Sequence, residues 1–137
     1  MLRLLTVSAF IFACSFAVGC ADDDPPAAPI TPPEEFTETF SGTLNILGAN
    51  LHTFSTQVQG QAQVQIESLA PDSAAVVSLI FGTWNNNNCQ VVLIKDDATT
   101  SSQLLGNASG LGSFCVRIAD IGRLTEPTTY TITVTHF

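Results

Sequence analysis

Apolar and polar residues alternate with a period of two over much of this chain. The run Gln61-Ala62-Gln63-Val64-Gln65-Ile66-Glu67 alternates without a break, which predicts a β-strand with one buried face. The same alternation recurs in three further segments, 52–58, 113–118 and 129–135. Segments 76–84 and 89–94 are more continuously apolar, as expected for central strands of a sandwich.

Short segments rich in turn-forming residues separate these runs. They lie at 48–50, 59–60, 71–73, 85–88, 95–97, 106–112 and 120–122. No stretch shows sustained helical spacing with capping residues. About eight strands within residues 36–137 predict an all-β domain, an antiparallel β-sandwich or jelly roll.

The beginning of the chain follows a different pattern. Arg3 precedes an uncharged apolar segment, 4–19, which is shorter than the roughly 20 residues of a membrane-spanning helix and fits a signal peptide. The run Ala17-Val18-Gly19-Cys20 resembles the lipobox of bacterial lipoprotein signal peptides. This resemblance implies a signal peptide at 1–19, palmitate-type lipid on Cys20, and an anchor in the bacterial cell envelope.

Because Ala21 and not Asp follows the cysteine, the resemblance also favours the outer membrane if the cell is Gram-negative. Two alternatives remain open. Gly19 and Ala21 are small enough for an ordinary secretory cleavage site, which would release a secreted protein. Cys20 would also be explained as an incidental apolar thiol.

Residues 20–35 predict a disordered tether. Positions 21–35 hold five acidic residues and five prolines, a composition that cannot bury enough apolar surface to fold. Residues 36–137 then form one domain with three basic and seven acidic residues, a formal charge of −4. This acidity argues against nucleic acid or anionic lipid as a partner, because both are bound through basic residues.

The domain contains two cysteines, Cys89 and Cys115. An isolated pair in an exported domain predicts a disulfide, which the chain-entropy model values at about 3–4 kcal/mol. Neither cysteine belongs to a Cys-x-x-Cys motif or has a histidine near it in the sequence. We therefore expect no metal centre and no cofactor.

Several of these segments together resemble a known family. They are Gly42-Thr43-Leu44, His52 to Gly60, Val64-Gln65-Ile66, Gly112 to Ile118 and Tyr130 to Val134. In this order they resemble the bacterial pre-peptidase C-terminal domain, a jelly-roll-like sandwich found beside secreted peptidases. The resemblance implies an accessory module of extracellular proteins without peptidase activity. Family members often carry acids in the strand matching 76–81, and this chain has none there, so no binding residue is transferred.

Catalysis has little support in the sequence. The two histidines, His52 and His136, lie on alternating strands, and neither a Gly-x-Ser-x-Gly nor a His-Glu-x-x-His motif occurs. Asp96, Asp97 and Asp120 lie in short turns, where aspartate is common for backbone reasons, and we favour this role over calcium binding. We expect Arg117 to pair with a neighbouring acid or to cover apolar surface with its alkyl stem.

The candidate ligand platform is the run Trp84, Asn85, Asn86, Asn87 and Asn88. An indole can stack on a sugar, and amides can hydrogen-bond to hydroxyls. The competing interpretation, which we favour, places Trp84 in the core beside an asparagine turn. We expect an interaction domain for protein or glycan without catalysis; the alternatives are a structural envelope lipoprotein and, third, an enzyme.

Overall fold

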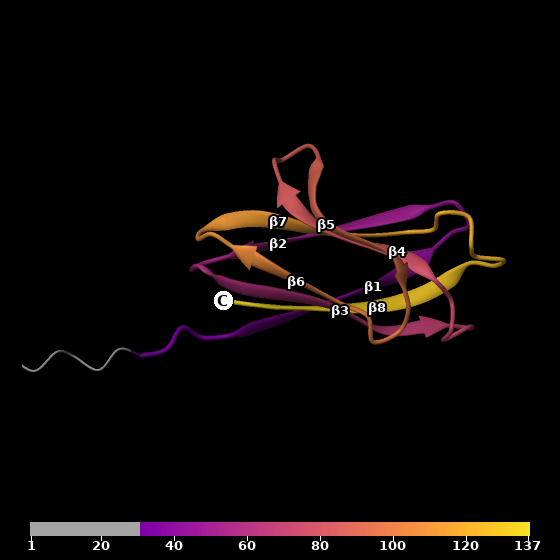
Figure 1. Cartoon of the computed structure of the whole chain (residues 1–137), viewed down its shortest axis with the longest axis horizontal. Helices are drawn as coiled ribbons and strands as arrows, with labels where there is room; N and C mark the ends of the chain where they lie inside the picture. Colours follow the sequence, from indigo (N-terminus) through magenta and orange to yellow (C-terminus); the bar gives the residue numbers. More distant parts are fainter. Residues whose placement is uncertain (1–30) are drawn as a thin grey trace, which may run out of the picture. The chain divides into compact units, whose positions relative to one another are not determined.

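The computed structural model describes residues 31–137 of the 137-residue chain. The signal peptide, the lipidation of Cys20 and most of the tether fall outside these residues. Eight strands follow the short exposed segment 31–35 (Figure 1). They are β1 (Phe36–Leu44), β2 (Ala49–Thr56), β3 (Gly60–Ala70), β4 (Val77–Trp84), β5 (Cys89–Ala98), β6 (Gln103–Ala108), β7 (Gly112–Ala119) and β8 (Thr128–His136).

The strands form two antiparallel sheets of four strands each. The first sheet has the order β1-β8-β3-β6 and the second sheet the order β2-β7-β4-β5. Successive strands alternate between the sheets over most of the chain, which is the connectivity of an eight-stranded jelly roll. The predicted all-β antiparallel fold is confirmed.

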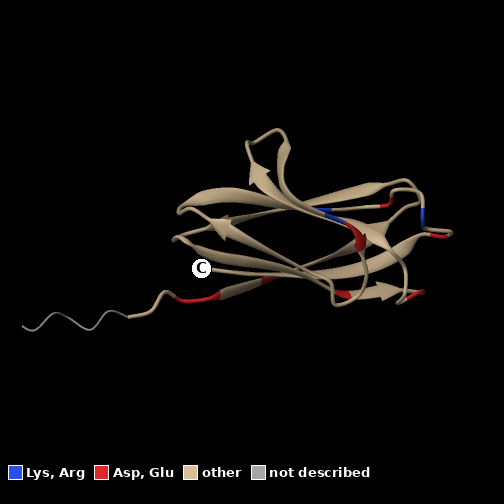
Figure 2. Cartoon of the chain, in the orientation of Figure 1, with Lys and Arg blue, Asp and Glu red and all other residues tan. Residues whose placement is uncertain are grey.

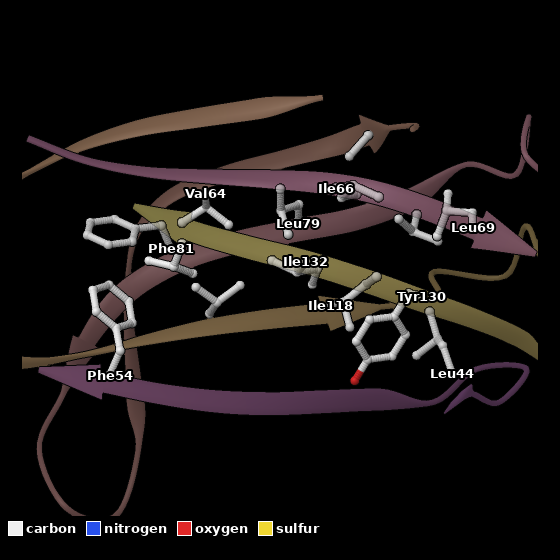
Figure 3. Close-up of a cluster of buried hydrophobic side chains, with 14 of the residues drawn as sticks. Leu44, Phe54, Val64, Ile66, Leu69, Leu79, Phe81, Ile118, Tyr130 and Ile132 are labelled. Atoms are coloured by element: carbon white, nitrogen blue, oxygen red, sulfur yellow. The ribbon is translucent and has the colours of Figure 1, made fainter. Parts of the chain in front are cut away.

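The core fills the space between the two sheets. Alternate residues of each strand point inward, as the period-two pattern predicts. The first sheet contributes Val64, Ile66, Leu69, Tyr130 and Ile132, and the second Phe54, Leu79, Phe81 and Ile118 (Figure 3). With both sheets supplying an apolar inner face, the outer faces are left to interact with solvent or a partner.

One predicted turn is wrong, and a second is shorter than predicted. Residues 95–97 belong to β5, where the pairing with β4 shifts between Val77 and Leu79 and accommodates the charged residues as a bulge. The predicted turn 106–112 is confined to residues 109–111, because 106–108 belong to β6 and Gly112 begins β7. A Cβ at Gly106 would collide with the ring of Phe81. The glycine in that strand therefore marks a close approach of the backbone to the core, and not a flexible loop.

The predicted turn at Asp120 is confirmed, and its carboxylate holds two loops together. Oδ1 accepts hydrogen bonds from the backbone N–H groups of Gly122, Arg123 and Leu124, and Oδ2 accepts one from Leu47, at 2.8–3.1 Å. Burial raises the pKa of Asp120, but these hydrogen bonds lower it by more, so its pKa lies below the ordinary value. Asp120 thus fastens the β1–β2 loop to the β7–β8 connection.

Within residues 31–137 there is no helix long and apolar enough to cross a membrane.

Candidate binding site

The predicted disulfide is confirmed, and it joins two strands that are not neighbours. Cys89 opens β5 and Cys115 lies in β7, while β4 runs between these strands in the second sheet. Strands two places apart in a flat sheet are separated by about 9.5 Å. The Cα atoms of Cys89 and Cys115 are only 5.8 Å apart. The start of β5 must therefore fold over the outer face of β4.

Gly82 allows this crossing. It pairs with Cys115 of β7 on one side and with Val91 of β5 on the other. A Cβ at Gly82 would collide with the backbone oxygen of Gln90 and would lie 2.9 Å from its carbonyl carbon and 3.1 Å from Sγ of Cys89. The absence of a side chain at Gly82 thus makes room for the backbone of β5 and for the disulfide.

A bulge lets β5 bend at this place. Gly82 pairs with Val91 and Phe81 pairs with Leu93, so Val92 is an additional residue in β5. Bulges bend the strand that contains them and increase its twist. In Figure 1 the connection between β4 and β5 accordingly projects away from the two sheets.

The asparagine run builds the tip of this hairpin. The side-chain oxygen of Asn85 accepts hydrogen bonds from the backbone N–H groups of Asn87 and Asn88, at 3.2 and 2.8 Å. Asn86 has a positive φ of 71°, a conformation that asparagine tolerates better than most residues. Asn85 and Asn86 therefore shape the turn, and Asn87 and Asn88 follow them as exposed residues.

A hollow of about 210 Å³ lies between the hairpin and the outer face of the second sheet. Its lining comes from all four strands of that sheet and from the hairpin tip, and consists of Leu51, Ile80, Trp84, Asn87, Asn88, Cys89, Val91 and Arg117. This volume is below the roughly 300–1,000 Å³ of sites for drug-sized ligands. It suits one or two side chains, or one sugar ring, of a larger partner.

Trp84 corrects the interpretation that we favoured from the sequence. It is half-buried, lies outside the core cluster and lines the hollow. Its parity in β4 explains this, because Val77, Leu79 and Phe81 point inward while Ile80 and Trp84 point outward. The structure thus brings Trp84, Asn87 and Asn88 together at one surface hollow.

Apolar side chains extend from the hollow across the second sheet. Leu51, Val91 and Ile94 are 41%, 52% and 54% exposed, and Ile94 pairs with the buried Ile80. We call this surface the hairpin face; it consists of Leu51, Ile80, Trp84, Val91, Ile94 and Arg117. The outer face of the first sheet differs, because threonine and glutamine dominate it, with hydrogen bonds such as Thr37–Thr135 and Gln103–Gln65.

Arg117 is the basic residue of the hairpin face. It is exposed and lies between Leu51 of β2 and Ile80 of β4 in the strand register. The structure records two ion pairs within residues 31–137, Lys95–Asp97 and His136–Glu38, and Arg117 belongs to neither. Of the two roles expected for Arg117, an ion pair is not found in the described part of the chain, whereas the register places its alkyl stem between Leu51 and Ile80.

The two histidines lie away from the hollow. His52 stacks on Phe40 with ring centroids 4.8 Å apart and shares a 2.8 Å hydrogen bond with the Tyr130 hydroxyl. Burial lowers the pKa of His52. His136 is buried against Phe54, and its Nε2 lies 3.0 Å from a carboxylate oxygen of Glu38. These contacts give both histidines a role in packing and in closing the sandwich.

The three acidic residues considered as calcium ligands, Asp96, Asp97 and Asp120, each interact with different groups. Asp96 accepts a hydrogen bond from Ser78, Asp97 pairs with Lys95, and Asp120 accepts the four backbone hydrogen bonds already described. Among residues 31–137, no group of three or more potential metal ligands comes together.

Sequence reasoning missed four residues of the hollow: Leu51, Ile80, Val91 and Arg117. Leu51 could have been recognised from the sequence. In a strand it points to the opposite face from His52 and Phe54, so it is an apolar residue on the face expected to be exposed. Val91 belongs to a continuous apolar run in which inward and outward positions cannot be told apart by period alone. Arg117 was recognised as a strand residue, but its neighbours across the sheet depend on the register.

No family model and no curated protein matches this chain. Among solved structures, the Yersinia pseudotuberculosis-derived mitogen is similar with a TM-score of 0.57 and 18% identity, over 76% of this chain and 88% of the mitogen. A periplasmic inhibitor of g-type lysozyme from Aeromonas hydrophila is similar with a TM-score of 0.50 and 8% identity, over 73% and 84%. At these identities the likeness establishes the fold.

Proposed function

We propose that this chain is an extracytoplasmic interaction protein, tethered to the cell envelope through a lipid on Cys20, that binds another protein through the hairpin face. The observation that carries the proposal is the exposure of aliphatic side chains around a hollow built by the disulfide-fastened hairpin. Contiguous apolar surface rimmed by polar groups is typical of protein-binding sites. Trp and Arg, both present here, are enriched among the residues that dominate binding energy.

Several features support protein over glycan as the ligand. A sugar site relies on aromatic platforms, and this face has one half-buried indole among Leu51, Val91 and Ile94. Aliphatic walls match the side chains of a protein partner more closely than the hydroxyls of a sugar. The two similar structures bear the names of a mitogen and of a lysozyme inhibitor, and the second name supplies g-type lysozyme as a first partner to test.

The alternatives are a structural envelope lipoprotein without a discrete ligand, a glycan-binding module related to pre-peptidase C-terminal domains, and an enzyme. The exposed aliphatic side chains of the second sheet, which contrast with the polar outer face of the first sheet, have no explanation in a purely structural protein. Within residues 31–137, neither histidine hydrogen-bonds to a serine, threonine or cysteine: their partners are Tyr130, which is buried in the core, Glu38 and a backbone oxygen.

The proposal is tested by photo-crosslinking in the native envelope. A photoreactive phenylalanine analogue replaces Ile94 on the hairpin face, and in a matched control it replaces Thr39, which is exposed on the first sheet. We expect a discrete protein adduct from position 94 alone, and its loss when Val91→Asp places a charge beside the hollow. Equal adducts from both positions, or none from position 94, would contradict a protein-binding hairpin face.

A further inference from the structure

The basic residues of the part of the chain that the structure describes are Lys95, Arg117 and Arg123 (blue in Figure 2), and Arg117 differs from the other two. Nζ of Lys95 lies 2.9 Å from a carboxylate oxygen of Asp97, and Arg123 donates a 2.8 Å hydrogen bond to the backbone oxygen of Asp96. The hydrogen bonds and ion pairs of residues 31–137 include none from the Arg117 guanidinium, although the domain has more acidic than basic residues. Within residues 31–137, Arg117 is thus the basic residue without a hydrogen-bond or ion-pair partner, and it is also the basic residue that lines the hollow.

The surroundings of Arg117 favour an anionic ligand. The hollow is lined by aliphatic groups and an indole, and no carboxylate lines it. A charge interaction is stronger beside apolar walls than in open water, because the effective dielectric constant is lower. The planar guanidinium can bind a carboxylate through two parallel hydrogen bonds. Asn87 and Asn88, on the same hollow, supply amide groups that can bind peptide or carboxylate oxygens.

We propose that Arg117 anchors an acidic side chain of the protein partner, while an adjoining apolar side chain of that partner enters the hollow over Leu51 and Ile80. This inference rests on the proposed protein-binding function and names the chemistry that the hairpin face recognises. The ligand is an acidic–aliphatic peptide segment, and the hollow accommodates its aliphatic member. A protein with a net negative charge repels anions in general. Arg117 is the basic residue that lines the hollow, so it restricts anion binding to this place.

The test uses two short peptides and the mature, lipidated protein in detergent. The probes are N-acetyl-Glu-Leu-amide and its neutral counterpart N-acetyl-Gln-Leu-amide, which differ by one charge. Trp84 is the single tryptophan of the chain, so its emission reports on the hollow alone. We expect a saturable change with the Glu peptide at millimolar concentration and binding about tenfold weaker for the Gln peptide.

Variants separate the guanidinium from charge in general. Arg117→Gln should remove the preference for the Glu peptide, and Arg117→Lys should restore only part of it, since an ammonium cannot form the parallel pair. The control Arg123→Gln should keep the preference, because Arg123 is bonded elsewhere. A preference that survives in Arg117→Gln, or no saturable change with either peptide up to tens of millimolar, would overturn the proposal.

Two further outcomes distinguish this inference from the function on which it rests. If galacturonic acid changes the Trp84 emission at lower concentration than the Glu peptide, the anion is an acidic sugar and the peptide assignment is wrong. If the crosslinked adduct from position 94 is unchanged by Arg117→Gln, the hairpin face binds protein without a carboxylate anchor. A strong loss of that adduct in Arg117→Gln, together with the peptide preference, is the result we expect.

Discussion

Substituting Gly82 with alanine should lift the hairpin from the sheet. A Cβ at Gly82 would lie 2.9 Å from the carbonyl carbon of Gln90 and still closer to its oxygen. Since carbon atoms in contact are normally about 3.5–4.0 Å apart, the backbone of β5 has to retreat by roughly 0.6–1.1 Å. The neighbouring atoms are backbone and a disulfide sulfur, so no flexible side chain can absorb the displacement.

The cost follows from two opposing terms. Overpacking of this kind costs about 1–3 kcal/mol, and an unyielding backbone places it at the upper end. The reduced conformational freedom of the unfolded chain returns about 0.4–1 kcal/mol. We expect Gly82→Ala to lower the free energy of unfolding by about 2 kcal/mol, which corresponds to about 10 °C in Tm for a domain of this size.

Urea denaturation followed by far-UV circular dichroism measures this stability, and Trp84 emission measures the local change. The emission of Gly82→Ala should shift to longer wavelength already in the native state, because the hollow opens to water. Gly112→Ala is a matched control in another strand, where the atom nearest to the added Cβ would be a side-chain carbon of Phe114 at 3.3 Å and the nearest backbone atom would lie 3.9 Å away. Wild-type stability and emission in Gly82→Ala, with the disulfide intact, would refute the crossing of β5 over β4.

Three further predictions concern the anchor, the disulfide and the buried carboxylate. Labelled palmitate should enter the wild-type protein and not Cys20→Ala, and equal labelling of the two would remove the lipid anchor from the proposal. Replacing both Cys89 and Cys115 with serine should cost about 3.5 kcal/mol by chain entropy, measured by urea denaturation, and should expose Trp84 to quenchers; a variant as stable as the oxidised wild type would contradict this. Asp120→Asn should cost about 2 kcal/mol, because its amide cannot accept from all four N–H groups, whereas the exposed Asp97→Asn should change little. Since the folded-state pKa of Asp120 is lowered, its contribution to the free energy of unfolding is fully present above the ordinary pKa of 3.8 and is lost as the pH falls through the folded value. The difference in stability between wild type and Asp120→Asn should therefore shrink in acid. A constant difference down to pH 2 would contradict the assignment.

The alternation of residues was sufficient to predict most strands, because a half-buried strand exposes every second side chain to water. Segment 61–67 shows this, since Ala62, Val64 and Ile66 are all buried in β3. The disulfide was also predictable, because the domain contains a single pair of cysteines. These features depend on local pattern or on counting.

The position of Trp84 could not be predicted in the same way. In 76–84 both parities are apolar, so the period does not reveal which residues face the core. The folding of β5 over β4 depends on Gly82, Val92 and a covalent bond to a strand that is distant in the sequence. The resulting hollow is a tertiary feature, and its neighbours Leu51 and Arg117 come together only through the register of the second sheet.

The covalent link across β4 also ties the hairpin face to the redox state of its surroundings. Disulfides form in oxidising compartments and are rare where thiols are kept reduced. A newly made chain can pair its strands before oxidation, but the closing of the 89–115 loop over β4 has to wait for an oxidant. With the extracytoplasmic location that we propose, the hairpin would be fastened over β4 only after export, which would link the proposed binding activity to the arrival of the protein in that compartment.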